Sequence, residues 1–210
     1  MLFKGKKHAP MACTALLAIF AAGPSLSLAA PLAPSTEATP SNATAAPASV
    51  NPATSMALVS ASPDARQALR WVVEFHDNQD LPFVIVDKKG GRIFVFEANG
   101  QLRGASPALT GLAPGDHAIA GMDQRSVASL RDYERTTPAG RFVSEPGHNL
   151  QGEAIVWIDY TAKLAIHRLP VSFYETVVGP VLGKSRGIVY VLPETQPLQR
   201  MLGALQLSQR

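Results

Sequence analysis

His167 is the residue whose type and setting point most directly to chemistry in this sequence. It follows the apolar run Leu164–Ile166, and six residues later, at Phe173, the pattern is already that of a helix. A histidine delivered by the end of a strand is a good general base, because an imidazole exchanges protons near neutral pH. It activates a nucleophile only within hydrogen-bond reach. The chemistry therefore depends on which nucleophile the chain places beside His167.

Other chemically capable residues have a simpler structural interpretation. His76 ends an apolar helix face and is predicted to be a partly buried edge residue rather than a ligand. Asp116-His117 would suit metal or acid–base work, but no second matched pair accompanies it. The glycines after Lys88-Lys89 lack phosphate-loop spacing, so this stretch is interpreted as a solvated turn. We expect no metal site.

Ser172 is the nearest hydroxyl on the C-terminal side of His167. The run "SFYE" matches a helix capping box, with Ser172 as the N-cap and Glu175 three residues on. The capping interpretation is preferred to a serine nucleophile, because a serine also needs a fully arranged base.

The first 29 residues are predicted to be a secretory signal peptide. Three lysines precede the apolar run "MACTALLAIFAA" (11–22), which is too short to span a bilayer comfortably. Small residues at Ser27 and Ala29 favour cleavage after Ala29, whereas Cys13 lies too early in the run to be a lipidated cysteine. We therefore expect a periplasmic or cell-wall-associated protein with no transmembrane segment after cleavage.

Removing this segment changes both the charge and the available chemistry. The full chain has 19 Lys and Arg against 16 Asp and Glu; the signal takes three lysines and no acid, which leaves a net charge of zero. No charge argument for nucleic-acid binding remains. The only cysteine, Cys13, also leaves, so the mature chain has no thiol for a disulfide, a metal site or a nucleophile.

The rest of the chain divides by composition. Residues 30–61, rich in Ala, Pro, Ser and Thr, are predicted to be a linker, either a functional spacer or a low-complexity tail. Residues 62–194 are predicted to be the folded domain, and 195–210 a C-terminal tail or short helix. Ser62 is a candidate N-cap, with Pro63 in the first position of a helix.

The domain is predicted to be mainly β, a β-rich α+β fold arranged as a sandwich or barrel with a few short helices. Asn99-Gly100 predicts a hairpin turn with positive φ at both residues. The strands expected from composition and alternation are Phe83–Asp87, Arg92–Glu97, 101–108, Arg141–Ser144, Ala154–Tyr160, Lys163–Arg168 and Gly187–Pro193. Short helices are expected near Arg125–Leu130 and Gln196–Leu207.

Three stretches together resemble the catalytic domain of the L,D-transpeptidases, also called YkuD-like. They are "RTTPAGRF" (135–142), "EPGHNLQGEAIVWIDYTAKLAIHRL" (145–169) and "VSFYETVVGPVLGKSRGIVYVLPE" (171–194). The resemblance implies a β-sandwich and peptidoglycan chemistry outside the cytoplasmic membrane. Members of the family use a cysteine thiolate to form an acyl-enzyme on a stem peptide, and a histidine upstream activates that thiol. By position His167 is the catalytic histidine, and Arg168 is a candidate contact for the stem peptide.

The family's cysteine stretch is missing here. It falls between the histidine and the following helix, where this chain has only Arg168, Leu169, Pro170 and Val171. The pattern is that of an internal deletion of one strand–turn segment, after which the domain either closes over the gap or is unstable. Two functions follow: an exported L,D-transpeptidase-family protein of peptidoglycan remodelling whose catalysis is impaired or absent, or a non-enzymatic domain that binds peptidoglycan or modulates a partner. Neither requires a cofactor.

Overall fold

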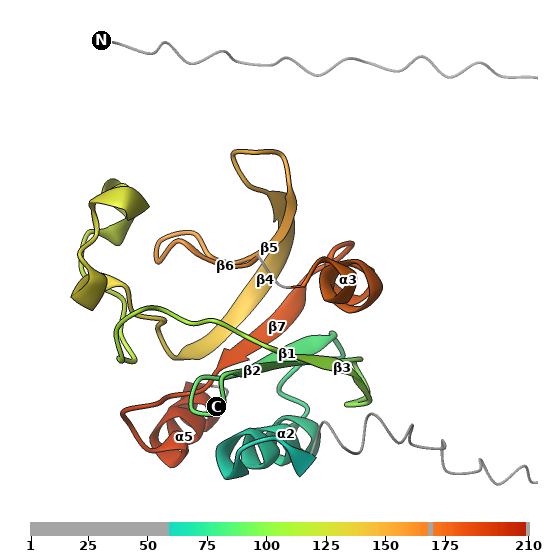
Figure 1. The fold of residues 1–210 in the computed structure, drawn as a ribbon. Helices are drawn as coiled ribbons and strands as arrows, with labels where there is room; N and C mark the ends of the chain where they lie inside the picture. Colours follow the sequence, from blue (N-terminus) through green and yellow to red (C-terminus); the bar gives the residue numbers. More distant parts are fainter. Residues whose placement is uncertain (1–58, 168–169, 209–210) are drawn as a thin grey trace, which may run out of the picture. The chain divides into compact units, whose positions relative to one another are not determined.

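The computed structural model describes residues 59–167 and 170–208 (Figure 1). The predicted signal peptide, most of the predicted linker and Arg168 lie outside these residues. The described part is mainly β, as predicted. None of its helices has the length and apolar character that crossing a bilayer requires.

One mixed sheet of seven strands organises the fold, in the order β3-β2-β1-β7-β4-β5-β6. Only the β1–β7 pair is parallel; the other neighbours are antiparallel. The strands are β1 (Phe83–Asp87), β2 (Arg92–Phe96), β3 (Leu102–Pro107), β4 (Gly140–His148), β5 (Ala154–Asp159), β6 (Leu164–Ile166) and β7 (Gly187–Val191). The predicted strands are all present, and β4 is twice as long as expected. Its first half pairs with β7 and its second half with β5, so β4 joins the two parts of the sheet.

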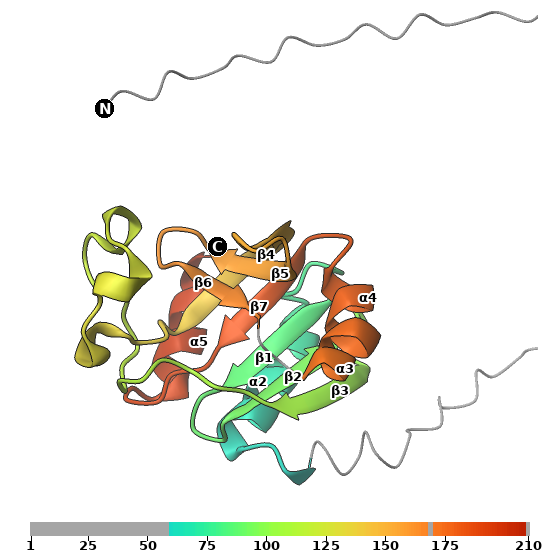
Figure 2. The same ribbon diagram turned by 45° about the horizontal axis from the view of Figure 1, so that its top comes forward.

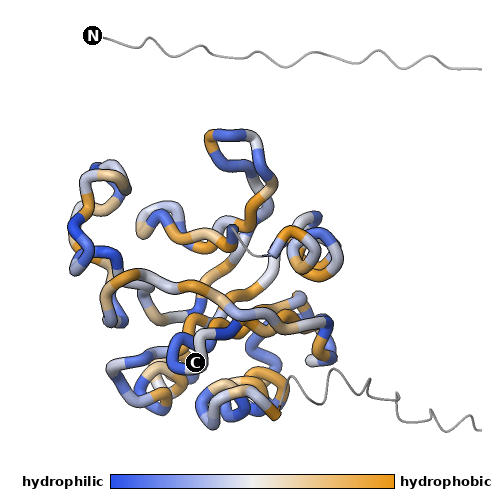
Figure 3. The backbone as a smooth tube through the Cα atoms, in the orientation of Figure 1, coloured by the Kyte–Doolittle hydropathy of each residue, from blue (hydrophilic) through white to orange (hydrophobic). Residues whose placement is uncertain are grey.

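Hydrophobic clusters cover both faces of the central strands. Helices α2 (Pro63–Phe75) and α5 (Leu198–Ser208) pack on one face through residues such as Val72 and Leu198. On the other face, β5 and β6 share a cluster with β1, β2, β7 and the helical segment after Pro170. Figures 1 and 2 show α2 and α5 together on one side of the sheet and α3 on the other. In Figure 3 the hydrophobic colour follows the central strands, whereas the β4–β5 loop is largely hydrophilic.

The first helix begins as its sequence predicts. The Ser62 side chain accepts a hydrogen bond from the Ala65 amide (3.1 Å), and Pro63 is the first helical residue. The buried face of this helix differs in part from the apolar face that the sequence predicts, which consists of Ala65, Ala68, Leu69, Val72, Val73 and His76. Trp71 is also buried, while Val73 is 43% exposed. His76 is exposed and closes the helix in a left-handed conformation, rather than being partly buried.

The Asn99-Gly100 hairpin is confirmed, but its predicted turn type is wrong. Only Gly100 has a positive φ, of 81°. Its amide donates to the Glu97 carbonyl, and the Glu97 amide donates to the Gln101 carbonyl, both at 2.9 Å. These bonds close a three-residue loop that ends in a left-handed glycine, the second common way to join antiparallel strands.

The short helix predicted near Arg125–Leu130 is present only as one 3₁₀ turn, the second of three between residues 122 and 134. Three 3₁₀ turns follow one another: Met122–Gln124, Val127–Ser129 and Asp132–Glu134. Two hydrogen bonds from Arg125 to the Glu134 carboxylate (2.8 and 2.9 Å) tie them together, and they lower the pKa of Glu134 to about 2.

Candidate functional site

His167 is placed by the β5–β6 hairpin. Val156 pairs with Ile166 and Trp157 pairs with Ala165, so β6 runs antiparallel to β5 and ends at Ile166, directly before His167. The turn before β6 is fixed by the Asp159 carboxylate, which accepts from the amides of Thr161 (2.8 Å) and Ala162 (3.0 Å). The His167 side chain is exposed. The next described residue is Pro170, so the contact predicted for Arg168 lies outside the described residues.

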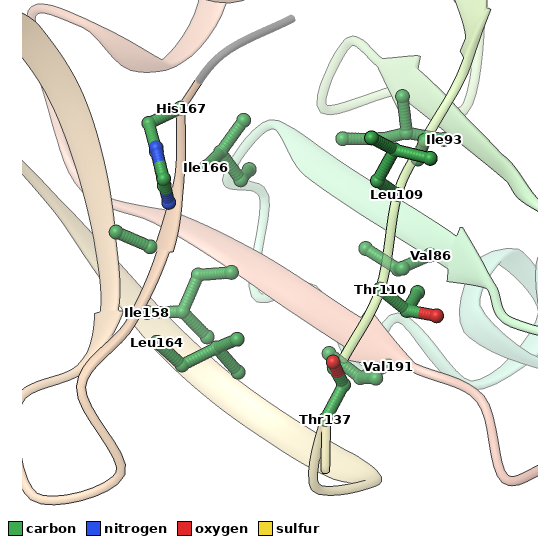
Figure 4. Close-up of a pocket in the computed structure, with 12 residues that line it drawn as sticks. Val86, Ile93, Leu109, Thr110, Thr137, Ile158, Leu164, Ile166, His167 and Val191 are labelled. Atoms are coloured by element: carbon green, nitrogen blue, oxygen red, sulfur yellow. The ribbon is translucent and has the colours of Figure 1, made fainter. Parts of the chain in front are cut away.

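An apolar cavity of about 290 Å³ opens beside β6. Figure 4 shows Ile158, Leu164 and Ile166 on one wall, Leu109 and Thr110 on the opposite wall and Thr137 at one end. His167 lies at the other end, and its ring is on the side of the strand away from Ile166. Successive side chains of a strand point to opposite faces. The imidazole therefore borders the cavity without pointing into its apolar interior.

A second hollow, of about 420 Å³, lies on the side of the imidazole. Its lining residues are Glu153, Ala154, Ile155, His167, Val171, Tyr174 and Glu175. This hollow brings His167 together with a phenol and two carboxylates. Tyr174 begins a π-helical turn (Tyr174–Val178), a rare conformation that often occurs at functional sites. Burial raises the pKa of Tyr174, so its hydroxyl stays protonated and can donate a hydrogen bond.

No serine or cysteine lines either hollow in the described part of the chain. The hydroxyl groups there belong to Thr110, Thr137 and Tyr174, and the Thr137 hydroxyl already accepts from the Gly111 amide (2.7 Å). Cys13 lies outside the described residues.

The capping box predicted at Ser172 is wrong. Helix α3 (Val171–Phe173) begins two residues earlier than a Ser172 cap predicts, directly after Pro170, and no side chain caps it. The Pro170 carbonyl accepts from the amides of Phe173 (2.8 Å) and Tyr174 (3.1 Å). Ser172 is therefore an exposed helical residue, and it lines neither hollow.

Asp116 is a structural clamp rather than a catalytic or metal-binding group. Its carboxylate accepts from Lys88 Nζ (2.8 Å), from the amides of Glu194, Thr195 and Gln196, and from the Thr195 hydroxyl. Burial alone would raise the pKa of Asp116, but these donors together lower it well below its usual range. Among residues 59–167 and 170–208, no group of three or more potential metal ligands is found.

The turn predicted at residues 88–91 is confirmed and Lys89 is exposed, but the prediction that Lys88 is solvated is wrong. Its side chain is only 1% exposed. Besides the Asp116 carboxylate, Nζ donates to the carbonyls of Gly115 (2.6 Å) and Thr137 (2.7 Å). Lys88 thus fixes both segments that border the apolar cavity: the stretch after Thr110 and the stretch at Thr137.

Two further features escaped the sequence interpretation. One is a buried network in which Asp77 accepts hydrogen bonds from Arg141 (2.7 Å) and from the Tyr190 hydroxyl. These two partners are 64 and 113 residues from Asp77 in the chain.

The other feature is an aromatic stack of Trp157 on Tyr160, with ring centroids 4.7 Å apart. The spacing of three residues across a hairpin turn is a weak signal for such a stack.

Comparison with known proteins adds no further assignment. No protein-family model matches the chain, and neither the curated proteins nor the solved structures contain a match.

Proposed function

We propose that the chain is an exported member of the L,D-transpeptidase family that acts at peptidoglycan but lacks the cysteine-dependent acyl transfer. One observation carries the proposal. Strand β6 delivers His167 to the edge of a hollow, and helix α3 begins at Val171, only four residues after His167. The nucleophile segment expected from the resemblance has no place in that junction, and the junction contains no cysteine.

The placement of the three family-like stretches supports this proposal. The first leads into β4, the second forms the end of β4 and the β5–β6 hairpin, and the third forms α3, the π-turn, α4 (Gly179–Leu182) and β7. The four strands β7, β4, β5 and β6 are consecutive neighbours in the sheet. Stretches that resemble one family in sequence thus form one continuous part of the fold.

The proposal includes a sandwich-like fold that lacks one strand–turn segment. The shared hydrophobic cluster supports it, because Val156 and Ile166 of the hairpin pack in the same cluster as Val84 and Val189 of the central strands. Two parts of one sheet therefore bury apolar side chains between them, as the layers of a sandwich do.

Loss of acyl transfer follows from the chemistry of the junction. His167 can accept a proton, but it needs a nucleophile within hydrogen-bond reach. The missing stretch would also carry backbone amides that stabilise an oxyanion, and losing one such donor costs roughly 3–4 kcal/mol of transition-state stabilisation. Both contributions are lost together.

Stem-peptide binding without catalysis is the second candidate function. The two hollows on either side of β6 favour it, because one is apolar and the other presents His167, Tyr174 and two carboxylates. A stem peptide combines small apolar alanine side chains with charged groups. The same surface would equally suit a role in modulating a partner at the cell wall.

An assay with the mature chain, residues 30–210, separates these functions. The protein is incubated with disaccharide-tetrapeptide, D-alanine release is followed by mass spectrometry, and binding to isolated sacculi is measured in parallel. We expect no turnover and saturable sacculus binding that is weakened by His167→Ala. His76→Asn is the matched control, since His76 is an exposed histidine at the end of α2. Turnover that disappears in His167→Ala would refute the loss of catalysis, and the absence of both signals would refute both functions.

A further inference from the structure

The stacked rings of Trp157 and Tyr160 form an aromatic surface outside both hydrophobic clusters. The angle between the two ring planes is 30°, and the ring centroids are 4.7 Å apart. Trp157 is half-buried, Tyr160 is 59% exposed, and neither belongs to the clusters on the two faces of the central strands. Trp157 thus supports the ring of Tyr160, which faces solvent.

The neighbouring backbone holds this stack in place. Tyr160 begins the β5–β6 turn, whose amides at Thr161 and Ala162 are bonded to Asp159. Gly147 of β4 lies against the indole, where a Cβ atom would come within 2.6 Å of Trp157 Cδ1. On the other side the residue paired with Trp157 is Ala165, whose side chain is also small. Small residues on both neighbouring strands therefore leave room for the indole ring and hold it in one position. Because the aromatic surface is already ordered, it loses little conformational entropy when a ligand binds.

Charged side chains lie at the edge of this aromatic surface. Glu145 is the residue of β4 directly opposite Trp157. Its carboxylate accepts from Arg186 at 2.8 Å, and the two side chains are 41% and 68% exposed. A flat aromatic face bordered by exposed hydrogen-bonding groups matches the surface of a pyranose. A sugar ring presents C–H groups on its face and hydroxyls around its rim, and the aromatic face is electron-rich.

We infer that Trp157 and Tyr160 form a binding platform for a pyranose ring of a glycan chain. The ring stacks on Tyr160, which Trp157 supports, and its hydroxyls reach Glu145 and Arg186. The expectation that the sugar is an N-acetylhexosamine rests on the proposed function; the aromatic platform itself does not.

The platform lies on the same face of the hairpin as the His167 side chain. Ala165 pairs with Trp157, and His167 lies two residues after Ala165, directly beyond the end of β6. Residues two apart in a strand share a face and are separated by about 7 Å. A glycan on the platform would therefore lie beside a peptide bound at His167.

The test uses the fluorescence of Trp157 in the mature chain. The protein has two tryptophans, and Trp71 is buried against Phe75, so Trp71→Phe leaves Trp157 as the only indole. In this background the protein is titrated with chitotetraose and, separately, with the free stem tetrapeptide. We expect a saturable change with chitotetraose, which Tyr160→Ala weakens about tenfold and Tyr160→Phe leaves nearly unchanged. Gly147→Ala should also weaken it, because the new methyl group displaces the indole.

Tyr133→Ala is the matched control, since Tyr133 is 65% exposed and lies in the 3₁₀ turns. Circular dichroism and thermal unfolding of each variant show that it is folded. The platform is refuted if chitotetraose gives no saturable change, or if Tyr160→Ala binds as tightly as Tyr133→Ala. Tetrapeptide binding that depends on His167, without glycan binding, would refute the platform alone. Glycan binding that depends on Tyr160, without peptide binding, would refute the stem-peptide site alone.

Discussion

Replacing Asp116 by Asn tests whether a buried ion pair holds the cavity wall in place. The carboxylate has five donors: Lys88 Nζ and the Glu194 amide on one oxygen, and the amides of Thr195 and Gln196 with the Thr195 hydroxyl on the other. An asparagine must direct its NH₂ group at one of these two sets. Donors would then face donors in a site where both side chains are almost fully buried, 1% exposed for Lys88 and 3% for Asp116.

The expected loss of folding stability is that of breaking a buried ion pair while the Lys88 ammonium group remains charged and buried. We expect Asp116→Asn to lower the free energy of unfolding by about 3–5 kcal/mol. For a domain of this size the melting temperature should fall by roughly 6–20 °C. The measurement is urea unfolding followed by tryptophan fluorescence and far-UV circular dichroism, together with a thermal scan.

The neighbouring lysine supplies a matched control. Lys89 pairs with Asp64 at 2.6 Å, but their side chains are 44% and 24% exposed. An exposed pair contributes little, so Lys89→Met should change stability by less than about 1 kcal/mol, whereas Lys88→Met should be much more costly. Equal effects of these two substitutions would refute the assignment of Lys88 and Asp116 as a structural clamp.

The clamp also predicts a direction of pH dependence. The pKa of Asp116 is lowered in the folded chain, so its ionised form stabilises the fold at every pH above its ordinary value of 3.8. This contribution is lost as the pH falls from that value towards the folded-state pKa. Stability should therefore decline between about pH 5 and pH 2, with a smaller decline in Asp116→Asn. The same decline in both proteins would show that other carboxylates cause it.

Other predictions concern the core, the first helix and export. Tyr190→Phe removes a buried hydrogen bond to Asp77 and should cost about 1–3 kcal/mol in urea unfolding. Ile158→Ala, in the cavity wall, should cost roughly 2–4 kcal/mol by the same measurement. Ser62→Ala removes the cap of α2 and should cost about 1 kcal/mol, with loss of helical signal in circular dichroism. Mass spectrometry of the periplasmic protein should find Ala30 as its first residue, and an unprocessed N-terminus would contradict the signal-peptide prediction.

The features that sequence predicted well depend on neighbouring residues. Ser62 and Pro63 mark the start of α2 because a cap and a fixed φ act within one turn. The hairpins at Gly100 and after Asp159 follow from turn residues between β-rich runs. In each case the residues that cause the local structure lie within about ten positions of one another in the sequence.

The features that sequence missed depend on distant partners. The local pattern around Lys88 is that of a turn, but the side chain is buried, and Asp116, 28 residues away, accepts a hydrogen bond from its ammonium group. The parallel pairing of β1 with β7 joins segments about 100 residues apart. At Ser172 the local capping signal was overridden, because the helix starts at Pro170 and then widens into a π-turn. The hollow shared by His167 and Tyr174 likewise exists only in the folded chain.

The short junction after His167 limits what the site can do. Four residue steps separate His167 from Val171, and even a fully extended chain covers only about 14 Å in that length. The end of β6 and the start of α3 must therefore stay close, and a loop carrying both a nucleophile and oxyanion donors does not fit between them.

Acyl transfer would then need one of the hydroxyls that line the hollows, and each has a physical obstacle. Thr110 stands on the opposite wall of the apolar cavity, while the His167 ring lies on the far side of β6. The Thr137 hydroxyl is held by the Gly111 amide at the other end of that cavity. Burial raises the pKa of Tyr174 and so disfavours the phenolate that would attack. Under the proposed function, the hollow beside His167 would hold a peptide, and none of the described hydroxyls that line the two hollows is suited to accept an acyl chain.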